Sequence, residues 1–149
     1  MDVPVVILVI LTAWLTWLLL QTNAGEPTFA LRINQSVFDA ARIVRGKSWS
    51  ALRVGLLNHA SLQEDSGLWL EGCRSVHTKG MRFAIDVVFV DAHGTVLRVV
   101  PFVELGQTVR GPRGTRATLE LAAGAAEGRF RISTGDKIQL CLAGPRRAS

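Results

Sequence analysis

Hydrophobic residues follow two different patterns along the chain, and the difference divides it into a leader and a domain. Val3 to Leu20 contains no charged side chain. Beyond Thr28, apolar residues come in short alternating or continuous runs, separated by clusters of Gly, Pro, Asn, Asp and Ser. Such runs are typical of β-strands joined by turns. The sequence therefore predicts a mainly β domain behind an apolar N-terminal segment.

The apolar segment is long enough to cross a bilayer. As a helix with a rise of about 1.5 Å per residue it would extend about 27 Å, close to the roughly 30 Å hydrocarbon core. A secretory signal peptide has a shorter apolar core and a positive start, whereas this chain begins Met-Asp-Val. Thr22 and Ala24 nevertheless match the small residues that precede a cleavage site. We expect an uncleaved transmembrane anchor over residues 1–24, with a signal peptide cleaved after Ala24 as the alternative.

The clearest strand pair is a hairpin in the middle of the chain. Ile85 to Val90 and Thr95 to Val100 are rich in β-branched and apolar residues, and the turn residues Asp91 to Gly94 separate them. This turn suits a type I conformation closed by Gly94 at a positive φ, which a residue without a Cβ adopts at no steric cost. Because both strands are apolar at most positions, we expect the hairpin to lie centrally in a sheet covered on both faces.

Weaker patterns on both sides complete the predicted domain. Further strands are expected over Thr28–Ile33, Ala40–Val44, Gly67–Leu70, Thr118–Leu121 and Lys137–Leu142. Asp39 to Arg45 also fits a helical turn, a short helix is expected after Ser48, and Ala122 to Glu127 fits a second helical turn. We expect one all-β domain over residues 28–143, a small barrel or sandwich with one or two short helices. Residues 25–27 link it to the leader, and residues 144–149 form a basic tail.

Several short motifs, taken together, resemble one family. They are SVHTKGMRFAIDVVFVD from Ser75, GLL from Gly55, GLWL from Gly67, LELAAG from Leu119 and TGDKIQL from Thr134. In this order they are similar to the domain of unknown function 192 family, from which the chain departs at Lys79 and Ala84. The resemblance implies a compact β fold in a small exported or membrane-anchored prokaryotic protein, and it implies no agreed biochemical activity.

Charge near the apolar segment bears on its orientation. Arg32, and marginally Arg42, lie within about 15 to 20 residues of the segment on its carboxyl side, which mildly favours a cytoplasmic domain by the positive-inside rule. The resemblance implies export instead. Following the resemblance, we expect the domain on the extracytoplasmic side of the membrane.

The charge of the whole chain limits the class of partner. Lys and Arg total 17 against 12 Asp and Glu, a net charge of +5. Such an excess favours contact with anionic groups and acidic surfaces. Nucleic acid is not the expected partner, because the chain has no lysine-rich tail, zinc-finger spacing or aromatic RNA-recognition motif. We expect an envelope protein or an anionic ligand.

Polar residues just before the central hairpin form the first candidate site. Asp86 begins an otherwise apolar strand, so if it is buried it must be ionically paired or hydrogen-bonded. Arg82, four residues earlier, is the expected partner, and His77 would complete the cluster. Such a cluster either fixes the loop that enters the hairpin or lines a ligand groove.

Three arginines in one loop form the second candidate site. Arg110, Arg113 and Arg116 are broken by glycine and proline, which exclude a regular helix. An arginine-lined loop can hold phosphate or carboxylate groups in bidentate pairs, although exposed arginines are commonly solvated.

Other chemistry receives less support from the sequence. Two cysteines, Cys73 and Cys141, are too few for a structural zinc site, and we expect neither a metal nor a cofactor. In an oxidising compartment the two can form a disulfide, and otherwise they are small packing residues. A serine hydrolase would use Ser75 and His77 with Asp86 or Asp91, but the chain has no Gly-x-Ser-x-Gly elbow.

The function expected from the sequence is that of a non-enzymatic, envelope-associated binding or assembly-accessory module. Its contact surface would combine His77, Arg82 and Asp86 with the loop Arg110 to Arg116. One alternative is a small cell-envelope hydrolase or carbohydrate-acting enzyme with His77 as general base. Another is an anchored scaffold that holds peripheral proteins at an anionic membrane surface.

Overall fold

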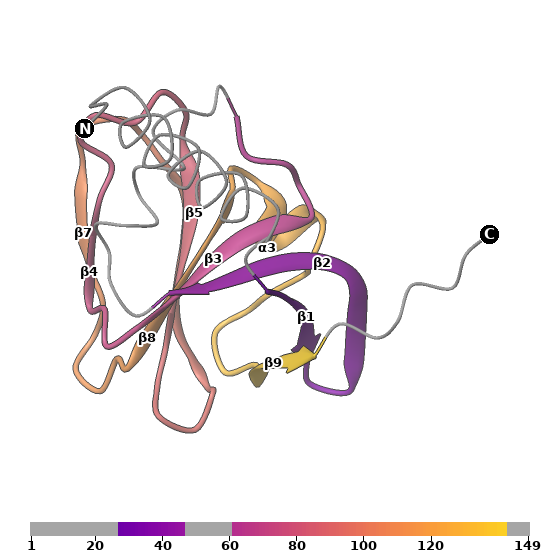
Figure 1. Cartoon of the computed structure of the whole chain (residues 1–149). Helices are drawn as coiled ribbons and strands as arrows, with labels where there is room; N and C mark the ends of the chain where they lie inside the picture. The colour runs from indigo at the N-terminus through magenta and orange to yellow at the C-terminus, as the bar shows by residue number, and fades with distance from the viewer. Residues whose placement is uncertain (1–26, 47–60, 143–149) are drawn as a thin grey trace, which may run out of the picture.

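The structure, a computed structural model, describes residues 27–46 and 61–142 of the chain (Figure 1). Its elements are β1 (Thr28–Ile33), β2 (Ser36–Gly46), β3 (Ser66–Glu71), β4 (Ser75–His77), β5 (Ile85–Val90), β6 (Val96–Val103), β7 (Thr108–Arg110), β8 (Ala117–Ala122), α3 (Ala125–Gly128) and β9 (Ile138–Leu142). The prediction of a mainly β domain is confirmed. Asp39 to Arg45 belong to a strand and not to a helical turn.

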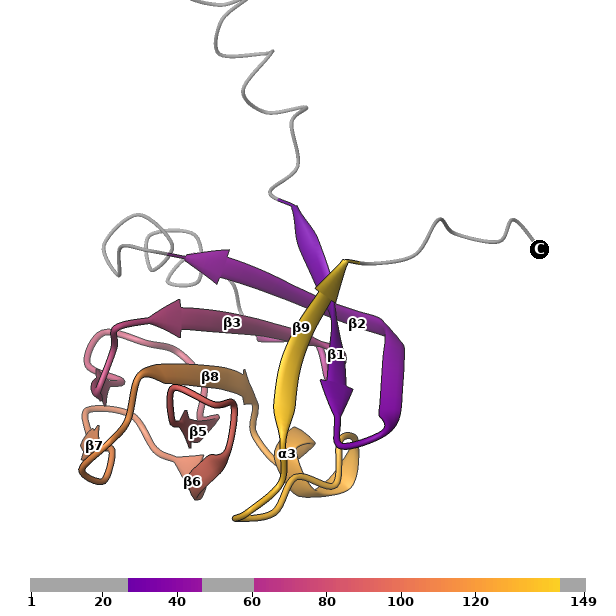
Figure 2. The same cartoon turned by 90° about the horizontal axis from the view of Figure 1, so that it is seen from below.

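Seven strands form one sheet in the order β6-β5-β8-β3-β2-β1-β9. Neighbouring strands are antiparallel except β2 and β3, which pair in parallel. Figure 2 shows β1 and β9 running steeply across the direction of β3 and β8, so the sheet is strongly curved. Among the described residues, its end strands meet only at an isolated bridge between Thr95 and Lys137 and the hydrogen bonds beside it. The sheet is therefore not a closed barrel, because no continuous ladder of the described residues joins β6 to β9, and the prediction of a barrel is wrong in this respect.

The central hairpin is confirmed, but its place in the sheet is not. β5 and β6 pair antiparallel, and Gly94 closes the turn at a φ of 79°. Asp91 Oδ1 accepts hydrogen bonds from the N–H groups of His93 and Thr95, both at 2.8 Å. The expected central position is wrong for β6, which is an end strand of the sheet. Pro101 has no N–H to donate, which fits an edge strand.

Burial on both faces, in contrast, is confirmed for β5. All six of its residues are buried. Val88 and Val90 pack into a core with residues of β1, β2, β8 and β9, while Val87 and Phe89 pack into a second core beneath β4 and β7. Each strand of this β4–β7 ribbon is three residues long, and the two pair antiparallel with Val76 opposite Val109. Figure 1 shows the ribbon at one side of the domain.

Two expectations concern residues that the structure does not describe. The apolar segment Val3 to Leu20 and the short helix after Ser48 both lie outside the described residues. Within the described residues 27–46 and 61–142, the only helix is α3, and it is too short to span a bilayer.

Candidate functional site

Asp86 is a structural residue at the junction of β5, β6 and α3. Its carboxylate is 0% exposed. Oδ1 accepts hydrogen bonds from the N–H groups of Phe102 and Gly124, and Oδ2 accepts one from Ala126, each at 2.9 Å. A carboxylate with several backbone donors is satisfied without a cation. We call these four residues the Asp86 junction.

The expected partner of Asp86 was therefore wrong. Arg82 is exposed, whereas all the hydrogen-bond donors to the carboxylate are backbone groups. The prediction that a buried Asp86 would be paired or hydrogen-bonded is confirmed. Its hydrogen-bond donors are backbone N–H groups as far as 40 residues away along the chain. A sequence pattern confined to one segment gives no signal for such partners.

His77 lies on β4 and lines a different feature. It borders a cavity of about 450 Å³ that neither Arg82 nor Asp86 reaches. The other lining residues are Gly46, Leu70, Glu71, Gly72, Cys73 and Ser75. We call this the His77 cavity. The Asp86 carboxylate accepts its hydrogen bonds within the Asp86 junction, and His77 lines a separate cavity. The structure therefore does not form the polar cluster expected of His77, Arg82 and Asp86.

Two of the three loop arginines come together at the ribbon. Arg110 and Arg113 line a cavity of about 320 Å³ with Arg74 and Ser75, and Gly111 and Pro112 complete its wall. We call this cavity the ribbon pocket. Arg116 lies elsewhere, in a cavity of about 530 Å³ that it shares with Trp69, Asp91 and other residues. The predicted arginine site is thus formed in part and gains Arg74, which lies on the partner strand's side of the ribbon.

The register of the β4–β7 ribbon brings these arginines to one place. Ser75 is directly opposite Arg110, and the carbonyl of Arg74 accepts a hydrogen bond from Gly111 N–H at 2.9 Å. A Cβ on Gly111 would come within 2.7 Å of Phe89 Cδ1, so only glycine allows the loop to approach the core this closely. The loop that carries Arg110 and Arg113 is therefore fixed against the domain at its start.

The loop is also fixed at its far side. The hydroxyl of Thr115 donates to the carbonyl of Pro112 at 2.8 Å, and Thr115 is 0% exposed. The Arg98 guanidinium donates to the carbonyl of Arg110 at 3.3 Å, which places a fourth cation near the pocket. These contacts fix the backbone that carries the arginine side chains.

The ribbon pocket carries positive charge without a compensating carboxylate. None of its lining residues is acidic. The salt bridge between Arg45 and Glu71 lies outside the pocket. Positive charges that line one cavity without a counter-charge repel one another, and a bound phosphate or carboxylate would relieve that repulsion through charge-assisted hydrogen bonds.

Both cysteines are present as free thiols. Cys73 Sγ donates to the carbonyl of Ser75 at 3.1 Å, while Cys141 lies on β9. The disulfide considered from the sequence is therefore not formed in this structure. The described residues also contain no group of three or more His, Cys, Asp or Glu side chains placed to hold a metal ion.

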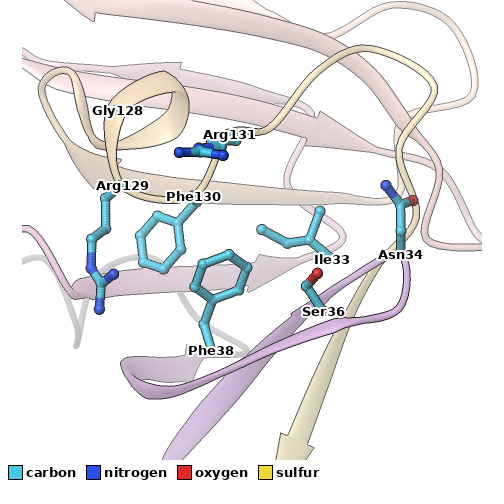
Figure 3. Close-up of a pocket in the computed structure, with 8 residues that line it drawn as sticks. All are labelled: Ile33, Asn34, Ser36, Phe38, Gly128, Arg129, Phe130 and Arg131. Carbon is cyan, nitrogen blue, oxygen red and sulfur yellow. The ribbon is translucent and has the colours of Figure 1, made fainter.

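One further cavity was missed by sequence reasoning. It has a volume of about 490 Å³ and lies where the β1–β2 turn meets the segment after α3 (Figure 3). Its lining residues are Ile33, Asn34, Ser36, Phe38, Gly128, Arg129, Phe130 and Arg131. We call it the aromatic pocket. The available signal was the sequence Arg-Phe-Arg at residues 129–131, which comes directly after the helical turn expected over Ala122 to Glu127 and Gly128.

Comparison with known proteins places the domain in a family. Residues 29–140 match the domain of unknown function 192, which is described as Uncharacterized ACR. The chain belongs to this family. Membership is consistent with the compact β fold and assigns no activity. A search of curated proteins finds no match.

Two crystal structures share the fold of this family member. One is a protein described as a "putative transcription regulator" from Sinorhizobium meliloti 1021, with a TM-score of 0.66, 16% identity and coverage of 79% of this chain and 97% of that chain. The other is a protein of unknown function from Novosphingobium aromaticivorans DSM 12444, with a TM-score of 0.64, 16% identity and coverage of 78% and 89%. At this level of identity the likeness concerns the fold alone.

Proposed function

We propose that this protein is a non-enzymatic binding module of the cell envelope, and that its ribbon pocket captures a phosphate or carboxylate group of its partner. The observation that carries the proposal is that Arg74, Arg110 and Arg113 line one cavity that has no acidic lining residue. Arginine forms bidentate hydrogen bonds with both phosphate and carboxylate groups.

The chemistry of the pocket supports binding in preference to catalysis. No histidine or carboxylate lines the ribbon pocket, and the Ser75 hydroxyl donates to the carbonyl of Val109 at 3.4 Å. Three guanidinium groups can hold an anion in a defined orientation. We therefore assign the pocket a role in recognition, in which neither the protein nor its partner is chemically changed.

Calorimetric titration tests the proposed binding. Full-length protein in phosphatidylcholine nanodiscs, which carry no net lipid charge, is titrated with inorganic phosphate and, separately, with malonate. We expect saturable binding of at least one of them, weakened by added NaCl, because screening reduces attraction between exposed charges. Arg110→Gln should weaken it about tenfold through the loss of a charge-assisted hydrogen bond. Arg42→Gln, which removes an exposed arginine on β2, is the matched control.

The binding proposal is wrong if neither anion binds at millimolar concentration. It is also wrong if Arg110→Gln and Arg113→Gln each bind as tightly as Arg42→Gln, because the anion would then lie elsewhere.

The envelope location rests on the uncharged segment Val3 to Leu20 and on the extracytoplasmic orientation expected from the family resemblance. We propose that the segment anchors the protein with its domain outside the cytoplasmic membrane. The protein should then sediment with membranes and be degraded by protease added to spheroplasts. A protein that remains in the soluble cytosolic fraction would contradict this location without affecting the ribbon pocket.

A second candidate function is favoured by the His77 cavity. There His77 shares a cavity with the free thiol of Cys73, the hydroxyl of Ser75 and the carboxylate of Glu71. A nucleophilic hydrolase needs a histidine that can reach a thiol or hydroxyl, and a rearrangement of this cavity would have to bring His77 to Cys73 or Ser75, whose hydrogens are donated to backbone carbonyls. Turnover of an envelope-derived substrate that is lost in a folded His77→Ala variant would establish this function and displace the non-enzymatic proposal.

A further inference from the structure

We propose that the aromatic pocket is a second binding site, independent of the ribbon pocket, and that it takes a small organic anion with an aromatic body. Its volume of about 490 Å³ lies within the range of about 300 to 1,000 Å³ that is typical of small-molecule sites. The proposal goes beyond the proposed function because it concerns other residues, at another place in the fold, and another class of ligand.

The wall of the pocket combines aromatic rings with two cations. The rings of Phe38 and Phe130 meet edge to face, with centroids 5.3 Å apart and an interplanar angle of 73°. Figure 3 shows Arg129 and Arg131 on different sides of this ring pair, and Ile33 adds an apolar side chain. Phe130 is buried and supports the half-buried Phe38, so an aromatic ligand ring can pack against Phe38 while its acidic group reaches a guanidinium.

The charge of the lining selects an anion. Arg129 and Arg131 are the charged lining residues, and no carboxylate lines the pocket. The Arg129 guanidinium lies 6.0 Å from the centroid of Phe130, at the outer limit of a cation–π contact, so it remains available to a ligand. Asn34 is already committed, because its amide donates to Asp136 and accepts from the N–H of Lys137. The polar lining residues left to contact a ligand are Ser36 and the two arginines, and only the arginines can distinguish an anion from a neutral molecule by charge.

The backbone at Arg131 supplies independent support. Its φ is 53°, a left-handed conformation that costs free energy for any residue with a Cβ. The neighbours hold it there: Phe130 N–H donates to Ala125 O at 2.9 Å, and Ile132 N–H donates to Ala126 O at 2.7 Å. Both flanking side chains are buried, at 1% and 5% exposure.

Glycine would adopt this turn without strain, as it does at Gly94 and Gly124. The chain carries arginine instead, with an exposed side chain that lines the pocket. Backbone strain at an exposed side chain that lines a cavity supports a binding role for that side chain. This makes Arg131 the residue on which the proposal can be tested most sharply.

Arg131→Gly separates binding from folding. It removes the guanidinium and also removes the backbone strain, so the melting temperature should equal or exceed that of the wild type. Full-length protein in phosphatidylcholine nanodiscs is titrated with 2-naphthoate by saturation-transfer difference NMR and calorimetry, with empty nanodiscs to correct for partition. We expect wild-type protein to bind and Arg131→Gly to bind at least about tenfold more weakly.

Companion variants and ligands complete the test. Phe38→Ala should weaken 2-naphthoate binding by a similar factor, whereas Arg42→Gln should leave it unchanged, because Arg42 does not line the pocket. The neutral analogue 2-naphthalenemethanol and the aliphatic anion octanoate should each bind at least about tenfold more weakly than 2-naphthoate.

Three outcomes would overturn the inference. They are the absence of 2-naphthoate binding to the wild type, equal binding by Arg131→Gly, and equal binding of either comparison ligand. Each would leave the ribbon pocket untouched, since that site is tested with phosphate and malonate and with Arg110→Gln. Failure of the two proposals is therefore distinguishable.

Discussion

At the Asp86 junction one carboxylate, 0% exposed, accepts hydrogen bonds from three backbone N–H groups. In the ribbon pocket three arginines share one cavity and meet no carboxylate within the described residues. Both regions attract attention in the sequence as charged residues beside apolar strands. A charged group whose hydrogen bonds are all made to the backbone therefore contributes to the fold, whereas one without a counter-charge is available to a ligand.

The largest expected effect concerns the junction. Asp86→Ala would leave three backbone donors without their acceptor, and we expect the free energy of unfolding to fall by about 4 kcal/mol. Asp86→Asn keeps one acceptor oxygen and should cost about half as much. Urea denaturation measures both. If Asp86→Ala unfolds at the wild-type urea concentration, the junction does not hold the fold and the contrast with the pocket fails.

The next effect concerns the ribbon pocket, where substitutions should change anion binding more than the free energy of unfolding. Arg74→Gln and Arg110→Gln should each weaken phosphate binding about tenfold, or about 1.4 kcal/mol, while changing the free energy of unfolding by less than about 0.5 kcal/mol. Calorimetry and urea denaturation of the same samples measure the two quantities. A loss of stability comparable to that of Asp86→Asn would show that these arginines are structural as well.

A smaller effect is expected at Asp91, which follows the other end of β5, and it concerns the pH dependence of stability. The N–H of Thr95, more than that of His93, lowers the pKa of the Asp91 carboxyl below its ordinary 3.8, against the opposing effect of its partial burial. A lowered folded-state pKa stabilises the fold above the unfolded-state pKa, and this contribution is lost as the pH falls through the folded-state value. Between neutral pH and about pH 3, the stability advantage of wild type over Asp91→Asn should therefore shrink. A constant difference would contradict this.

The smallest effect is expected at Arg82. Because Asp86 is satisfied by backbone donors and Arg82 is exposed, Arg82→Ala should change the free energy of unfolding by less than about 0.5 kcal/mol. Thermal or urea unfolding of the single variant decides the point. A loss near 2 kcal/mol would restore the ion pair that the sequence suggested.

Local features of the fold were predictable, and long-range ones were not. The β5–β6 hairpin and its Gly94 turn follow from a nearby run of apolar residues and a turn signal. β4 and β7 were not expected, because three-residue strands are too short to show an alternating pattern. The edge position of β6 and the open sheet depend on which distant strands pair, and no local pattern specifies that.

The candidate sites divide in the same way. Arg110 and Arg113 were recognised because their loop is rich in arginine, but Arg74 joins them only through the register of the ribbon. Burial of a satisfied Asp86 followed from its apolar neighbours, while its partners lie on β6 and around α3. The aromatic pocket combines segments that are far apart in the chain, so the sequence offered only the Arg-Phe-Arg at one wall.

The most direct measurement is a ¹H–¹⁵N correlation NMR titration of the full-length protein in nanodiscs with inorganic phosphate. Binding in the ribbon pocket should shift the amide signals of Ser75, Gly111 and Arg113 in a saturable way and leave those of Gly124 and Ala126 in place. Saturable shifts centred on the Asp86 junction, or no saturable shifts anywhere, would contradict the assignment of the ribbon pocket as the anion site.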